Sequence, residues 1–347
     1  MNLTVLRMAV DTLEVSIGGR VRPYVADVLD RWKLQAQEDE TPAYSPMGGL
    51  DFAVQAQGLA PYRWVMKGDD ATVSATPSAK LPGASVRLSA KGLAYYEPAD
   101  LLGLLVDIVA DYLGPADEPK TSRLDLCVDF QGFDMARLGG ARFITPASFR
   151  PVYPNIEHPE TYQFGKGDVV VRVYNKSREL RVSGKTWMTA LWELNPDYDP
   201  AQDVWRFEVQ YRRGALVELG AGTPAEAFAM LPELLRYALS WTDLRVPNGS
   251  SSELWPRHPV WDALAEATGT HTLLERATRS ASLGDLARIV AAVAGYVTSA
   301  GAVLDVYEFD EAWRILGNRV CARLGEDADY AAKVRRRKLT RLGREST

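Results

Sequence analysis

Three segments of this chain alternate between apolar and polar residues, which is the pattern of β-strands with one buried face. They are Ser122–Phe130, Val170–Lys176 and Trp205–Arg212. If the three strands lie in one antiparallel sheet, their apolar sides share a core and their polar sides form one surface. That surface carries carboxylates, basic groups and a single phenol, namely Arg123, Asp125, Asp129, Arg172, Tyr174, Lys176, Arg206 and Glu208.

Helical patterns surround these strands. Apolar residues recur at helical spacing over residues 99–113, and Gly114-Pro115 ends that segment. The run Thr223–Glu226 combines an N-cap threonine, a proline at the first helical position and a glutamate at the third. It predicts a helix that continues to about Trp241.

A linker divides the chain into two expected domains. Val246–Ser252 is rich in Pro, Gly, Asn and Ser, and it separates residues 1–245 from residues 246–347. The first part predicts an α+β fold, an antiparallel sheet with packed helices. The second predicts a smaller all-helical domain, because its pattern is helical over residues 260–268, 271–280, 282–299 and 307–324.

Composition limits the kinds of function that the chain can have. A net charge of −5 over 347 residues argues against a protein that coats nucleic acid through bulk charge. With no run of about 18 apolar residues and no signal-like start, we expect a cytoplasmic protein without a membrane partner. One basic cluster stands near the end and either contacts DNA or forms a solvated tail: Arg335, Arg336, Arg337 and Lys338.

The carboxylates of the polar surface are candidate metal ligands. Mg²⁺ and Mn²⁺ favour carboxylate oxygens on a rigid frame, and Asp125, Asp129 and Glu208 offer them. Residues four apart on a strand lie about 13 Å apart, so Asp125 and Asp129 need not both contact the metal. The alternative is that these carboxylates form salt bridges on the exposed sheet face, with Arg123 and Arg206 as their partners.

Tyr174 is the candidate nucleophile of the same surface. A phenol has a pKa near 10 and must lose its proton before it attacks phosphorus. Arg172 and Lys176 flank Tyr174 on its side of the strand, and cations favour a phenolate and hold a phosphate. The sequence therefore predicts phosphoryl-transfer chemistry at Tyr174.

Several other kinds of site are unsupported. The three histidines, His158, His258 and His271, form no His-x-His pair, and no cluster of arginines with a histidine accompanies Tyr174 as in a tyrosine recombinase. The glycine pairs Gly48-Gly49 and Gly139-Gly140 lack the spacing of a phosphate-binding loop, so an ATPase is not indicated.

Three blocks of the sequence, in their order and spacing, resemble the replication initiation factor family of rolling-circle plasmids and phages, the Rep-trans type. The blocks are Ser122–Asp129, Arg172–Lys176 and Trp205–Glu208, and the resemblance extends over about residues 10–245. In that family the tyrosine of a Tyr-x-Lys motif cuts DNA, and carboxylates bind the metal. The matching positions here are Tyr174 with Lys176, and the carboxylates Asp125, Asp129 and Glu208.

The resemblance implies a rolling-circle replication initiator, a metal-dependent nickase and ligase that forms a 5′-phosphotyrosyl intermediate through Tyr174. It implies Mg²⁺ or Mn²⁺ as cofactor and origin DNA as partner, with a host helicase and a homodimer as further candidates. Arg123, Arg172 and Arg206 are then expected to contact DNA phosphates. Two other classes stay open: a DNA-binding protein that does not cut, and a polymerase or primase palm, which needs no Tyr174.

Overall fold

A computed structural model describes most of this chain. It covers residues 3–40, 43–47, 50–138, 140–154, 159–185, 187–267, 293–294, 297–298 and 300–325. Two compact units make up the chain, Met1–Glu275 and Arg276–Thr347, and each is treated by itself.

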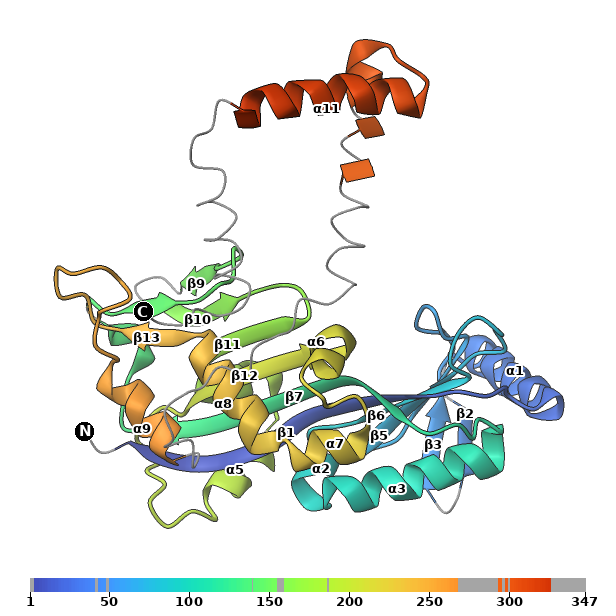
Figure 1. Ribbon diagram of the computed structural model, residues 1–347. Helices are drawn as coiled ribbons and strands as arrows, with labels where there is room; N and C mark the ends of the chain where they lie inside the picture. Colours follow the sequence, from blue (N-terminus) through green and yellow to red (C-terminus); the bar gives the residue numbers. More distant parts are fainter. Residues whose placement is uncertain are drawn as a thin grey trace. The chain divides into compact units, whose positions relative to one another are not determined.

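An antiparallel sheet forms the frame of the first unit (Figure 1). Its strand order within the described residues is β2-β3-β4-β5-β6-β1-β7-β12-β11-β10-β9. A separate pair of short strands, β8 and β13, lies outside it. The bounds of the strands are β1 Thr4–Ile17, β2 Ala43–Met47, β3 Leu50–Val54, β4 Trp64–Lys67, β5 Ala71–Ala75, β6 Ala84–Leu88, β7 Lys120–Gln131, β8 Arg142–Ile144, β9 Val152–Pro154, β10 Pro159–Phe164, β11 Val169–Asn175, β12 Trp205–Arg212 and β13 Asp243–Arg245.

The three alternating segments of the sequence become neighbouring strands. β12 lies between β7 and β11 and pairs with both in antiparallel register. Arg206 is level with Asp129 on one side and with Tyr174 on the other. Cross-strand partners point to the same face of a sheet. The predicted α+β fold with an antiparallel sheet is therefore confirmed, and the polar residues of the three strands do share one face.

Helices cover the apolar face of this sheet. Figure 1 shows the last helices of the first unit lying across its strands. Among the helices of the described residues, none combines the length and the apolar character that crossing a membrane requires. The helix bounds are α1 Pro23–Glu38, α2 Gly92–Tyr95, α3 Pro98–Ile108, α4 Lys176–Ser183, α5 Trp187–Trp192, α6 Arg213–Glu218, α7 Pro224–Ala229, α8 Leu231–Trp241, α9 Pro259–Ala267 and α11 Phe309–Gly325, with a π-helical turn at Val109–Leu113 and a 3-10 turn at Met135–Arg137.

The first unit extends past the boundary at residue 245 that the linker suggested. α9 adds Trp261 and Leu264 to the main core, and both are fully buried. The Trp261 indole packs edge-on against Phe207 of β12 and donates a hydrogen bond to the Leu239 carbonyl oxygen at 3.0 Å. The loop after β13 therefore connects two parts of one core, since the apolar face of α9 is buried against the sheet domain.

The N-terminus of α7 offers a test of local stability. Thr223 and Glu226 form a capping box, in which each side chain accepts a backbone N–H of the other residue. The predicted helix to Trp241 is interrupted after Ala229, because Pro232 cannot continue it and instead starts α8. We expect Thr223→Ala to lower the free energy of unfolding by about 1 kcal/mol. Chemical denaturation measures this, and an unchanged midpoint would contradict it.

In the second unit, α11 matches the helix predicted over residues 307–324. The predicted helix over residues 271–280 lies outside the described residues, as does the basic cluster Arg335, Arg336, Arg337 and Lys338.

Candidate active site

The polar face of the sheet is divided into a covered end and a partly open end. α4 and α5 lie over the covered end, where they form a small apolar core with Leu6 of β1. This core also contains Leu180, Met188, Trp192 and Val204. Strand residues beneath these helices are removed from water, whereas Arg123 and Arg172, farther along the face, keep about a quarter of their side-chain surface exposed.

Tyr174 lies near the boundary between the two ends, close to the end of β11. Its hydroxyl donates a hydrogen bond to Glu208 Oε2 at 2.8 Å, and Arg172 Nη1 donates to Glu208 Oε1 at 3.1 Å. Burial, and then the charge of Glu208, raises the pKa of Tyr174 well above its ordinary value. The phenol is therefore neutral near pH 7, and a carboxylate stands ready to accept its proton.

Lys176 lies beside Tyr174, but as the first residue of α4 rather than as part of the strand. The strand ends at Asn175, whose side chain accepts the backbone N–H of Arg178 at 2.9 Å and so caps the helix. The Lys176 ammonium is 5.6 Å from the centre of the Tyr174 ring and donates to Glu179 Oε2 at 2.6 Å. The structure thus brings the predicted pair Tyr174 and Lys176 together.

Arg206 and Asp129 form a buried ion pair at the covered end. Arg206 donates from Nε to Asp129 Oδ1 at 2.6 Å and from Nη2 to Asp129 Oδ2 at 2.8 Å. Arg206 Nη1 reaches Asp11 at 2.7 Å, and the Trp192 indole N–H reaches Asp129 at 2.9 Å. Burial by itself would raise the pKa of Asp129, but Arg206 and Trp192 hold it below its ordinary value.

This network corrects two predictions. The Asp129 side chain is 0% exposed beneath α4 and α5, and its oxygens accept from Arg206 and Trp192, so it does not lie among the carboxylates of the partly open end. The Arg206 side chain is likewise 0% exposed, so it cannot contact a DNA phosphate. Burial under α4 and α5 is the physical reason in both cases, because these helices turn an expected surface pair into an internal one.

Asp125 and Glu208 remain as candidate ligands on the partly open end. They are diagonal neighbours across β7 and β12, where Gln210 is level with Asp125 and Glu208 with Cys127. Arg123 Nε donates to Asp125 Oδ1 at 2.8 Å. Burial raises the pKa of Asp125 to about 6 despite Arg123, and Glu208 adds to the effect.

The residues present fit a metal ion with few protein ligands. No group of three His, Cys, Asp or Glu side chains that could hold a metal occurs among the described residues. Mg²⁺, however, is commonly held by one or two carboxylates with waters and substrate phosphates. Asp125 and Glu208 supply two such carboxylates, and a metal ion there would take the place of Arg123 on Asp125 and of Arg172 on Glu208. Burial is the main reason that the pKa of Asp125 is raised, and a bound cation would lower it.

Asp11 is a site residue that the sequence analysis missed. Val10 pairs with Leu126 and Thr12 with Asp125, so Asp11 is the extra residue of a β-bulge. The bulge turns its carboxylate to the polar face, where it reaches Arg206. Simple alternation assigns Asp11 to the apolar side with Leu13, and a carboxylate on that side is the one signal that an irregularity is present.

Comparisons with known proteins give a structural likeness. No protein-family model matches the chain, and no curated protein matches it in sequence. Among solved structures, the chain is similar to a rolling circle replication initiator protein from Geobacillus stearothermophilus, with a TM-score of 0.41 and 16% sequence identity. The alignment covers 77% of this chain and 97% of that chain.

Proposed function

We propose that this chain is a rolling-circle replication initiator that nicks and rejoins one DNA strand through Tyr174. One observation carries the proposal. The Tyr174 hydroxyl donates a hydrogen bond to the Glu208 carboxylate at 2.8 Å, and Arg172 and Lys176 lie beside it. The group lies where the covered part of the polar sheet face meets its open part. A phenol with a proton acceptor and adjacent cations is the arrangement that tyrosine attack on a phosphodiester requires.

The proposed reaction is a transesterification. The Tyr174 oxygen attacks the phosphorus while its proton passes to Glu208, and the bond from phosphorus to the 3′-oxygen breaks. The products are a 5′-phosphotyrosyl link and a 3′-oxygen, which takes a proton from water and can prime synthesis. The phosphotyrosyl bond keeps the energy of the phosphodiester, so the same steps in reverse rejoin the strand without a nucleotide.

Asp125 and Glu208 would hold the metal ion. A bound Mg²⁺ or Mn²⁺ would polarise the non-bridging oxygens of the scissile phosphate. Because Glu208 also accepts the Tyr174 proton, it links the nucleophile to the metal site.

Arg123 and Arg172 are the proposed phosphate contacts near the cleavage point. Each is paired with a carboxylate, Asp125 or Glu208, and each keeps part of its side chain exposed, at 26% and 28%. We assign contacts outside the cleavage point to the basic cluster Arg335, Arg336, Arg337 and Lys338. Phosphate contacts of this kind add affinity that falls steeply with salt.

The test is to incubate the protein, with and without Mn²⁺, with a supercoiled plasmid that carries the DNA flanking the gene of this protein. We expect relaxed open circles together with a protein–DNA adduct that survives denaturation and maps to Tyr174. Binding without any cleavage under these conditions would contradict the proposal and favour a DNA-binding protein that does not cut.

Metal binding gives a separate prediction about Asp125 and Glu208. We expect Glu208→Gln and Asp125→Asn to weaken Mn²⁺ binding, measured by electron paramagnetic resonance, and to slow nicking by roughly 10²-fold or more. Glu14→Gln is the matched control, because Glu14 is a carboxylate on β1 opposite Arg123 and should leave both quantities unchanged. Equal Mn²⁺ binding by the wild type and all three variants would remove the metal from this site.

A further inference from the structure

The first half of β1 is an open edge of the sheet. β7 pairs with β1 from Thr4 onward, whereas β6 pairs only with Leu13–Ile17. On the side away from β7, residues 4–10 have no strand partner among the described residues. An unpaired edge presents backbone N–H and C=O groups and can accept a further strand.

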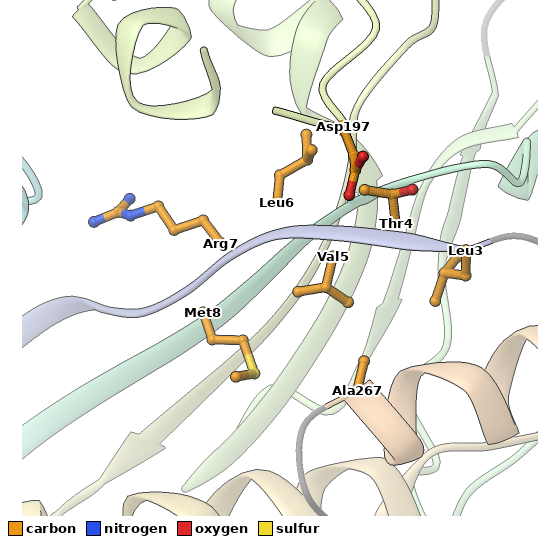
Figure 2. Close-up of a pocket in the computed structure, with 8 residues that line it drawn as sticks. All are labelled: Leu3, Thr4, Val5, Leu6, Arg7, Met8, Asp197 and Ala267. Carbon is orange, nitrogen blue, oxygen red and sulfur yellow. The ribbon is translucent and has the colours of Figure 1, made fainter. Parts of the chain in front are cut away.

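A groove follows this edge. It has a volume of about 500 Å³ and is lined by six consecutive residues of the chain, Leu3–Met8, with Asp197 and Ala267. Alternate side chains of a strand point to opposite faces of the sheet. Six consecutive residues can therefore line the same groove only if the groove runs along the edge of the strand and is open to both faces. Figure 2 shows Asp197 on one side of the strand and Ala267, at the end of α9, on the other.

The two walls of the groove differ in chemistry. One side carries the Asp197 carboxylate with Thr4 and Leu6, whereas the other is apolar throughout, with Leu3, Val5, Met8 and Ala267 (Figure 2). Asp197 is exposed, and its carboxylate makes no hydrogen bond or ion pair within the part of the chain that the structure describes. It belongs to a loop, residues 193–203, that carries Glu193, Asp197, Asp199 and Asp203 and no lysine or arginine.

Arg7, the cationic residue among those that line the groove, does not pair with Asp197. Arg7 is level with Asp129 across β1 and β7, and Figure 2 shows its guanidinium directed away from Asp197. One backbone group of this stretch is already used, since Asn195 Nδ2 donates to the Val5 carbonyl oxygen at 3.1 Å, so an added strand would bond to the remaining groups of the edge.

We propose that this groove binds an extended segment of a partner protein, which adds to the open edge of β1 as a strand. Its side chains alternate between basic residues, which face Asp197, and apolar residues, which face Leu3, Val5 and Ala267. Backbone hydrogen bonds give such binding its affinity, and the side-chain pattern gives its specificity. An acidic wall repels phosphates, so the groove suits a peptide and not the DNA bound near Tyr174. The proposal does not depend on DNA cleavage.

The experiment uses the full chain and a fluorescent peptide of about eight residues, the length of an ordinary strand. The peptide alternates lysine and valine, and its controls alternate glutamate and valine or carry N-methyl groups on the lysine–valine backbone. We expect anisotropy to show saturable binding of the lysine–valine peptide alone. Asp197→Lys should weaken that binding roughly tenfold, because a charge pair becomes a like-charge contact.

Glu193→Lys is the matched variant, since it reverses an exposed charge in the same loop outside the groove. It should change peptide affinity much less, and both variants should nick DNA as the wild type does. Binding that is unaffected by Asp197→Lys overturns the proposal. Displacement of the peptide by a single-stranded oligonucleotide would assign the groove to DNA. Loss of peptide binding when the chain dimerises would assign the groove to a second copy of the chain. Either result also overturns the proposal.

Discussion

Tyr174→Phe is expected to abolish the covalent protein–DNA adduct and to reduce nicking by roughly 10³-fold or more. The change removes one oxygen atom and leaves the ring beside the Lys176 ammonium. The hydrogen bond to Glu208 is lost, but Arg172 still pairs with that carboxylate, so the fold should persist. Denaturing gels with a labelled oligonucleotide measure the adduct, and circular dichroism checks the fold.

Tyr211→Phe is the matched control for this variant. Tyr211 lies on the buried side of β12, and its hydroxyl bonds to the Leu234 carbonyl oxygen, so its loss should cost some stability but no activity. An adduct that maps to another tyrosine would contradict the assignment of Tyr174. Undiminished activity of Tyr174→Phe in nucleotide incorporation would instead favour a polymerase or primase, which has no need of the hydroxyl.

Arg206→Met is expected to lower the free energy of unfolding by about 3–5 kcal/mol, because it leaves the buried Asp129 carboxylate without its counter-ion. Asp129 and Asp11 both lose their ion pair in this variant. The effect on DNA affinity, measured at a temperature where the variant is folded, should be small, since Arg206 is inaccessible. Urea denaturation gives the stability.

The pH dependence separates this effect from a general loss of packing. The folded-state pKa of Asp129 lies below its unfolded value near 3.9, so its contribution is present above that value and lost as the pH falls through the folded pKa. In Arg206→Met, Asp129 stays buried without its cation, so its folded-state pKa should rise above the unfolded value and its protonation should stabilise the variant already above about pH 4. The stability difference between wild type and variant should therefore begin to shrink above about pH 4 and shrink further below it, where the wild type loses the contribution of Asp129.

Arg172→Met is the control for Arg206→Met, because Arg172 also pairs with a carboxylate but keeps 28% of its side chain exposed. It should cost less than about 1 kcal/mol and should weaken DNA binding. If Arg206→Met instead weakened DNA binding without loss of stability, Arg206 would be a DNA contact on the surface, as the sequence predicted.

Much of the sheet could be predicted from the sequence. A period of two is a strong signal in Ser122–Phe130 and Trp205–Arg212, since large apolar residues occupy every second position and most positions between them are polar. It placed Tyr174 and Glu208 on one face, and the structure adds the hydrogen bond between them. The prediction worked because β7, β12 and β11 pair without register shifts.

The predictions that were wrong concern residues whose environment depends on packing from other elements, and the alternation of apolar and polar residues carries no information about that packing. The same polar face can be open or covered, and only the packing of α4 and α5 shows that Arg206 and Asp129 are internal. Asp11 was missed because a bulge changes the side on which a residue points. The core of the first unit extends beyond the boundary predicted at residue 245, because Trp261, which follows the Pro- and Gly-rich loop, is buried in that core.

The position of Tyr174 on β11 has a mechanical consequence. If a DNA strand is attached to this residue, any tension on that strand enters the protein through β11, which is bonded to β10 on one side and β12 on the other. A load directed along β11 would act in shear on two ladders of hydrogen bonds, so that many would have to break together. Directly after Tyr174 the chain turns into α4, which Asn175 caps and also ties to Asp203 at 2.7 Å. The attachment point is thus held on both sides, by the neighbouring strands β10 and β12 and by the capped start of α4.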